Sequence, residues 1–236
     1  SYYLDEDVSP QNPYYYKVTA LDASANESGF SNEASIYTPL SYKAGWPVVA
    51  GTRGGYNWSS AIPGDIDGNG YKEVVLGTND GHLYVLRHDG NSVNNWPKDF
   101  GTAYVSTALG DVDKCGLPEI VAGVCNEGIL KVYIYKNDGS LLAENSVYTG
   151  TIPDIESAIS IADVDRNGWL NIILMSKGTA TIYNYEWNSA TSTIDQIWSY
   201  TVPGGSPMGI AVGDINADDC LEIVFGTWTS TGDVYA

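Results

Sequence analysis

Side-chain oxygens recur at fixed spacing in four nine-residue stretches of the chain. Each stretch has Asp or Asn at positions 1 and 3, a turn-forming residue at position 6 and an acid or amide at position 9, and three of the four have Asn or Asp at position 5. A hard cation such as calcium takes roughly six to eight oxygens, and a backbone carbonyl at position 7 adds to the side chains that point inward. The pattern therefore predicts calcium loops. We number them loop 1 to loop 4; they are residues 65–73, 111–119, 163–171 and 214–222.

An EF-hand begins with a similar pattern, but it needs a bidentate Glu at position 12 and a helix after the loop. Position 12 here is Leu76, Ala122, Leu174 or Phe225, and none of these side chains can bind a cation. Each loop is instead followed by an apolar run of strand length, such as EVVLGT after loop 1. We therefore expect each loop to connect two strands.

The four loops differ in their donor atoms. Loop 1 is complete, whereas loop 2 has Cys115 at position 5, where a thiol is a poor ligand for a hard cation. Loop 3 has Asn171 at position 9, and loop 4 has Asn216 at position 3 and Asp219 in place of glycine at position 6. Up to four Ca²⁺ ions are expected, with affinity falling in the order loop 1, loop 4, loop 3, loop 2. The alternative is a set of Asx turns that need no metal. The predicted ligands, in which position 7 contributes its carbonyl, are Asp65, Asp67, Asn69, Tyr71 and Glu73; Asp111, Asp113, Leu117 and Glu119; Asp163, Asp165, Asn167, Trp169 and Asn171; and Asp214, Asn216, Asp218, Cys220 and Glu222.

The loops also reveal an internal repeat, because their first residues are 46, 52 and 51 positions apart. A period of this size is typical of arrays and propellers. The first repeat is predicted to hold an inner strand at 59–64, strands at 73–78 and 83–88, and an outer strand near Trp96, which together make the four-stranded blade of a β-propeller. The predicted blades are near 58–100, 104–150, 156–202 and 207–236, the last of them incomplete.

A Trp-Pro pair is also repeated: it occurs in residues 45–50, GWPVVA, and again in the segment Asn95-Trp-Pro. If that segment is an outer strand, residues 45–50 are predicted to be an outer strand without a blade of its own, as a ring closed by distant parts of the chain requires.

Composition supports an all-β fold. The 236 residues include 18 Tyr, 7 Trp and 26 Gly, no helical period persists, and no transmembrane segment is expected. The formal charge of −18 disfavours nucleic acid as a partner, and eleven of the 29 acidic residues are predicted ligands. Cys115, Cys125 and Cys220 have no metal-binding spacing and are expected to be free thiols.

The first 39 residues form a separate unit. Residues 13–20 alternate as a half-buried strand does, and a second strand is predicted at 29–38. This segment resembles the last two strands of a fibronectin type III domain, with Tyr14 at the corner position whose hydroxyl binds nearby backbone. The rest of that sandwich is expected upstream in a longer protein; the alternative is a hairpin that packs against something else. Residues 40–236 are assigned to the repeats.

The run D-x-D-x-N-G followed by EVVLGT resembles the FG-GAP or VCBS repeat of integrin α-subunits and secreted microbial proteins, and the resemblance covers roughly residues 43–236. It implies a propeller of seven or eight blades with calcium bound in the blade loops, and it implies no reaction.

No catalytic motif occurs, and His82 and His88 are expected at the surface, so no catalytic residue and no organic cofactor are predicted. The leading hypothesis is a non-catalytic, calcium-stabilised module of an exported multidomain protein, which binds a protein or glycan ligand, mediates adhesion, or acts as a spacer beside neighbouring domains. The first alternative is the propeller of a secreted polysaccharide lyase or protease. The second is a self-assembling subunit of a surface layer or filament. An extracellular location is expected because calcium modules with Kd values of about 10⁻⁴–10⁻³ M work outside cells.

Overall fold

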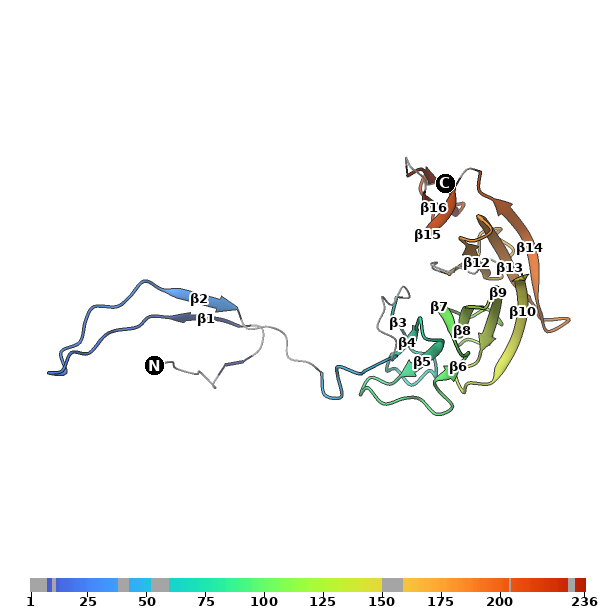
Figure 1. Ribbon diagram of the computed structural model, residues 1–236. Helices are drawn as coiled ribbons and strands as arrows, with labels where there is room; N and C mark the ends of the chain where they lie inside the picture. The colour runs from blue at the N-terminus through green and yellow to red at the C-terminus, as the bar shows by residue number, and fades with distance from the viewer. Residues whose placement is uncertain are drawn as a thin grey trace. The chain divides into compact units, whose positions relative to one another are not determined.

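The structure is a computed structural model that describes residues 8–9, 12–37, 43–51, 60–149, 159–203, 205–228 and 232–236. All strands in this part of the chain pair antiparallel, and it contains no helix (Figure 1). The all-β prediction is therefore confirmed. The chain divides into two units, residues 1–47 and 48–236. The predicted boundary at Pro39, the strand start at Ser59 and the blade limits at 58, 150 and 156 lie outside the described residues.

The first unit is a two-stranded sheet. Strand β1 (Pro13–Tyr16) pairs with β2 (Ala34–Tyr37), and Tyr14 and Tyr16 are less exposed than their neighbours, as the alternation predicts. The hydroxyl of Tyr14 accepts a hydrogen bond from the backbone N–H of Ser9 at 2.6 Å, the kind of bond expected of a corner tyrosine. Two strands do not make a sandwich, so the fibronectin type III assignment stays a prediction.

The described residues of the second unit form four sheets, each with its strands in chain order, which we call blades 1 to 4. The first strand of each blade is connected to the second by one of the four loops. Blade 1 is β3 (Ile62–Gly64), β4 (Glu73–Gly77), β5 (His82–Leu86) and β6 (Lys98–Asp99). Blade 2 is β7 (Ala103–Gly110), β8 (Glu119–Asn126), β9 (Ile129–Tyr135) and β10 (Leu141–Thr149). Blade 3 is β11 (Ser160–Ala162), β12 (Asn171–Ser176), β13 (Thr181–Asn188) and β14 (Thr193–Thr201). Blade 4 is β15 (Ser206–Gly213), β16 (Glu222–Trp228) and β17 (Val234–Tyr235).

One strand prediction is wrong. Residues 45–50 form no strand, although the Trp46-Pro47 and Trp96-Pro97 peptide bonds are both cis. The outer strand of blade 1 is β6, just after the second Trp-Pro pair. The N–H of Gly51 instead donates to the hydroxyl of Tyr84 on β5 at 3.3 Å.

Apolar side chains fill the space between successive blades. The strands that follow loops 2 and 3 are buried along almost their whole length, because neighbouring blades cover both of their faces. One cluster packs Val75 and Leu83 of blade 1 with Val105 and Ile120 of blade 2. Two further clusters join blade 2 to blade 3 and blade 3 to blade 4.

The backbones of blades 1 and 2 also meet directly at Gly77. A Cβ atom there would overlap the carbonyl oxygen of Val105 in blade 2. Beside it, the N–H of Val105 donates to the carbonyl of Thr78 at 3.1 Å. The glycine that ends the apolar run after loop 1 therefore permits this close approach.

Candidate metal centre

All four loops adopt the same backbone conformation. Positions 4 and 6 have positive φ in every loop, and Asp219 at position 6 of loop 4 has φ 64°, as expected from its tolerance of the left-handed region. The left-handed residue at position 4 was not predicted, because only Gly68 signals it. The others at position 4 are Lys114, Arg166 and Ala217, whose φ values are 60°, 59° and 62°.

The first Asp of loops 1, 2 and 3 is held in the same way. Its Oδ2 accepts the N–H of position 6 at 2.9, 3.0 and 2.9 Å. Its Oδ1 is buried and accepts no hydrogen bond from the described residues. A buried acceptor left without a partner costs about 1–3 kcal/mol, and more when it is charged. Three such oxygens at one position of a repeated loop, each beside further oxygen donors, fit a bound cation.

Position 9 is buried in the same three loops. Glu73 and Glu119 are 2% exposed and Asn171 is 0% exposed. Each side chain accepts the N–H of position 2, at 3.2, 2.9 and 2.9 Å. Burial raises the pKa of both Glu73 and Glu119. A positive charge in the loop would offset that cost and keep the two carboxylates ionised.

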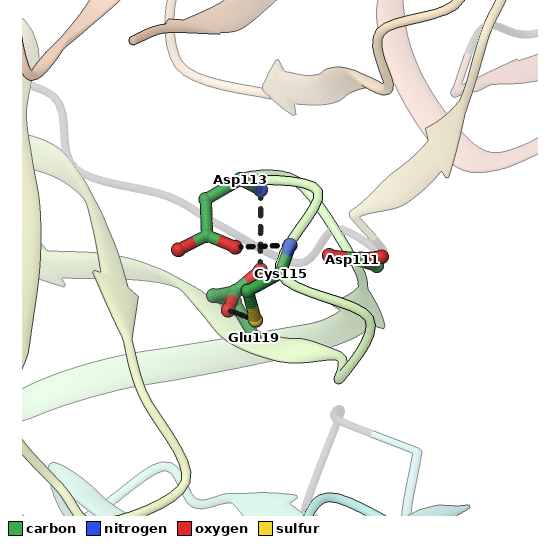
Figure 2. Close-up of side chains that lie close together, drawn as sticks. All are labelled: Asp111, Asp113, Cys115 and Glu119. Carbon is green, nitrogen blue, oxygen red and sulfur yellow. Dashed lines mark hydrogen bonds between the residues drawn. The ribbon is translucent and has the colours of Figure 1, made fainter.

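Two of the loops gather three or more acidic or thiol side chains. Among the described residues, these sets are Asp65, Asp67 and Glu73 in loop 1 and the four side chains of loop 2 shown in Figure 2. Within each set the candidate ligand atoms lie within 4.8 Å of one another. Loop 2, placed last from its sequence, thus brings its acids together as closely as loop 1.

The residue at position 5 separates loop 2 from the others. In loops 1, 3 and 4 an oxygen of Asn69, Asn167 or Asp218 accepts the N–H of position 7, at 2.7, 2.7 and 2.8 Å. Cys115 has no such oxygen. Its Sγ lies 3.5 Å from the carbonyl oxygen of Leu117 and 3.5 Å from Oε1 of Glu119, which are the predicted ligand atoms at positions 7 and 9.

Two of the predicted ligands of loop 3 are amide side chains, and one of these contacts a residue outside the loop that was not predicted from the sequence. Asn171 has a buried Nδ2 without a partner among the described residues. Asn167 donates to Asp165 at 3.2 Å and to Oε2 of Glu186 at 2.7 Å. Glu186 lies on β13, in the third strand of the blade, and no motif marks it. Only the pairing of β12 with β13, which places Asn171 opposite Glu186, could have indicated it.

Loop 4 satisfies its first Asp differently. Oδ1 of Asp214 accepts three backbone N–H groups, those of Asn216, Ala217 and Asp218, at 3.2, 2.6 and 3.3 Å. Burial acts to raise the pKa of Asp214, but the backbone donors together outweigh it and lower that pKa. Nδ2 of Asn216 donates to Asp218 at 3.1 Å and to Glu222 at 3.4 Å. The oxygens of this loop therefore already have partners within the protein.

Neighbouring loops contact each other through position 4. Nζ of Lys114 in loop 2 lies 4.0 Å from the ring centroid of Trp169 in loop 3. Arg166 in loop 3 donates to the carbonyl of Asp218 in loop 4 at 3.4 Å. Tyr71 of loop 1 stacks instead on His88 of its own blade, with centroids 4.6 Å apart. Loops 2, 3 and 4 therefore lie side by side.

The remaining candidates are placed as follows. Nδ1 of His82 lies 3.2 Å from Oδ1 of Asp80, in the turn after β4. The cysteines are all free, as expected, with Cys125 buried and Cys115 and Cys220 exposed. Among the described residues there is no helix with the length and hydrophobicity to cross a bilayer.

Comparison with known proteins agrees with this architecture. The model of the FG-GAP-like repeat matches residues 163–225, which include loops 3 and 4. No curated protein matches the sequence significantly.

Solved structures of rhamnogalacturonan lyases are similar in fold. YesW is 18% identical with a TM-score of 0.54, over 99% of this chain and 52% of its own. The exotype enzyme YesX is 18% identical with a TM-score of 0.52, over 94% and 48%. The Bacillus licheniformis enzyme is 17% identical with a TM-score of 0.52, over 89% and 47%. The chain spans about half the length of these enzymes, and the likeness fits a β-propeller module of a larger protein.

Proposed function

We propose that this chain is a calcium-stabilised propeller module of an exported multidomain protein. The observation that carries the proposal is the buried Oδ1 of Asp65, Asp111 and Asp163, which accepts no hydrogen bond from the described residues. An isolated Asx turn satisfies itself, as loop 4 does, and has no reason to bury a carboxylate oxygen without a donor.

Loop 1 has the donor set that suits calcium best. Asp65, Asp67, Asn69 and Glu73 supply side-chain oxygens, and Tyr71 supplies its carbonyl. When bound, the ion supplies two positive charges that offset the repulsion between the acids. The chain's own part is to hold the loop open: the left-handed residues at positions 4 and 6 turn the backbone, and Glu73 fixes position 2 through the N–H of Ile66. Binding to the folded state alone stabilises the fold by mass action.

The role of such a module is to present a surface or to position a neighbouring domain. An extracellular location follows from the affinity typical of such loops, roughly 10⁻⁴–10⁻³ M, because calcium at that level is found outside cells. The ring is expected to have seven or eight blades, as the FG-GAP resemblance implies.

A second candidate is that the parent protein is a polysaccharide lyase. It is favoured by the extent of the fold likeness, which reaches 99% of this chain in one rhamnogalacturonan lyase and so includes residues of both units. Fold analogy is a weak guide to chemistry. The test is an assay of the full-length parent for release of unsaturated rhamnogalacturonan fragments, with calcium and with chelator. Absence of product under both conditions would contradict the lyase candidate and leave the non-catalytic module as the remaining proposal.

Thermal unfolding tests the main proposal. The chain is melted in excess chelator and then with millimolar calcium, and magnesium serves as the control cation. At calcium 100-fold above Kd, each occupied site adds about 2.7 kcal/mol. At roughly 2–4 °C per kcal/mol for a unit of this size, the melting temperature should rise by several degrees for each site. A melting temperature that calcium leaves unchanged would contradict the proposal.

A further inference from the structure

We infer that loop 2 selects a thiophilic divalent cation, zinc above all, over calcium, and that Cys115 determines this selectivity. The inference rests on the proposed function, since it takes metal binding by the loops as its premise. It changes the identity of the metal at loop 2 and leaves loop 1 as a calcium site.

The position of the thiol is the first argument. Sγ of Cys115 lies 3.5 Å from the Leu117 carbonyl and 3.5 Å from Oε1 of Glu119, so it faces the predicted donor atoms of positions 7 and 9. In the other three loops the position-5 oxygen accepts the N–H of position 7 and supports the turn. Cysteine at this position therefore lacks the oxygen that accepts the position-7 N–H, and its thiol instead donates to two of the predicted ligand oxygens.

The surrounding acids are the second argument. Candidate ligand atoms of Asp111, Asp113, Cys115 and Glu119 all lie within 4.8 Å of one another, and these are the side chains drawn in Figure 2. Glu119 is 2% exposed. Oδ1 of Asp111 is buried and has no hydrogen-bond partner in the part of the chain that the structure describes. That oxygen is an observation independent of the thiol, and it calls for a positive charge at this place.

The kind of donor then selects the metal. Calcium binds through roughly six to eight oxygens. Zinc is usually four-coordinate and accepts cysteine sulfur together with carboxylate oxygen. Loop 2 offers three carboxylates and one thiol, which matches the smaller coordination number. On binding, the sulfur–hydrogen bond is replaced by a sulfur–metal bond and the proton passes to solvent.

A nearby lysine disfavours calcium further. Nζ of Lys136 lies 3.6 Å from Oδ2 of Asp113 and offsets part of the negative charge of the loop. Calcium is held by electrostatic attraction to oxygens, so this loss of charge weakens its binding directly. A metal–thiolate bond depends less on net charge, because sulfur is a soft donor.

Cobalt binding tests the inference, because a thiolate bound to Co²⁺ gives a charge-transfer absorption in the near ultraviolet. The reduced, metal-free chain is titrated with Co²⁺ and then with Zn²⁺ as competitor. Cys115→Asn installs the residue found at position 5 of loops 1 and 3. Cys220→Ser is the matched control, because the Cys220 thiol is exposed and belongs to no cluster of acidic and thiol side chains among the described residues, and the substitution keeps the backbone carbonyl that loop 4 would contribute.

The wild type and the Cys220→Ser variant should show the absorption band and lose it on addition of zinc. The Cys115→Asn variant should lack the band and bind zinc at least about tenfold more weakly, since loss of even a supporting contact of a metal ligand has an effect of that size. Absence of the band from the wild type, or its persistence in Cys115→Asn, would overturn the inference.

A second readout needs no substitution at Cys115. In the Cys220→Ser background, zinc should slow modification of Cys115 by a maleimide at least tenfold, while calcium should leave the rate unchanged; equal effects of the two ions would also overturn the inference. Calcium melting of the same samples separates the two proposals. If calcium stabilises the chain and zinc never reaches the thiol, only this inference fails. If neither ion has any effect, the proposed function fails with it.

Discussion

Loops 1 and 4 have the same length, positive φ at positions 4 and 6, and similar apolar runs after them, yet the hydrogen bonds of their first aspartates differ. Asp65 keeps one buried oxygen that accepts no hydrogen bond from the described residues, whereas both oxygens of Asp214 accept hydrogen bonds from backbone N–H groups. This difference accompanies a difference in the burial of the residue at position 2. Ile66 is 1% exposed and packs in the cluster between blades 1 and 2, while Ile215 is 62% exposed.

We propose from this contrast that a ligand spacing of this kind becomes a metal site when the next blade packs on it. Packing on position 2 goes with burial of position 9, as in loops 1 and 2, where Ile66 and Val112 are buried together with Glu73 and Glu119. In loop 4 no such packing is seen among the described residues, and its carboxylates accept hydrogen bonds from amide groups of the same loop. The following predictions test that contrast in order of expected effect.

The largest effect is expected for Ile66→Ala compared with Ile215→Ala. Truncating a buried isoleucine costs about 2–5 kcal/mol, because it leaves a cavity between two blades. The exposed residue should change the free energy of unfolding by no more than about 0.5 kcal/mol. Urea unfolding of both variants in chelator measures the difference, and equal costs would show that packing does not distinguish the loops.

Asp65→Asn and Asp214→Asn should differ in their response to calcium. Asp65→Asn should remove about 2.7 kcal/mol of stabilisation at calcium 100-fold above Kd and cost little in chelator. Asp214→Asn should lower the melting temperature equally with and without calcium, because it weakens bonds to backbone amides. Melting curves under both conditions provide the measurement. A calcium-dependent loss in Asp214→Asn would mean that loop 4 is also a site.

The pH dependence of stability should report the burial of Glu73. Burial raises the pKa of Glu73 above 4.5, so without metal the folded chain binds the proton more tightly than the unfolded chain. This group's contribution therefore falls as pH rises from 4.5 through its folded pKa, the reverse of a carboxylate with a lowered pKa. In chelator, Glu73→Gln should flatten the fall of melting temperature with pH. A Glu73→Gln slope equal to that of the wild type would count against the burial argument.

The smallest effect is expected for Asn216→Asp, which gives loop 4 a third acid among positions 1, 3 and 5. The change replaces the donor to Asp218 and Glu222 with a like charge. The variant should melt slightly lower than wild type in chelator and gain more from calcium. Calorimetric titration would detect any added calcium equivalent, and unchanged calcium binding would show that the closed loop, rather than the charge count, limits loop 4.

Much of the fold could be predicted from local pattern. The apolar runs after the loops and the turn residues at Asn79-Asp-Gly81 place strands within a few residues, since both signals act over short distances. The strand at residues 45–50 was predicted wrongly because a repeated Trp-Pro pair does not indicate whether a segment pairs with the edge of a sheet. Glu186 was missed because its contact with Asn167 depends on strand pairing.

The sequence by itself determined the four loops, their donor types and the turn at position 6 of each, because these depend on residue types, hydrogen bonds and φ angles within nine residues. Only the tertiary structure decided which aspartate oxygen accepts no hydrogen bond from the described residues and which glutamate is buried. Those outcomes depend on how neighbouring blades and strands pack around each loop. Burial determines the energetic cost of an unpaired charge, and the burial of a loop residue depends on the structure that packs around the loop.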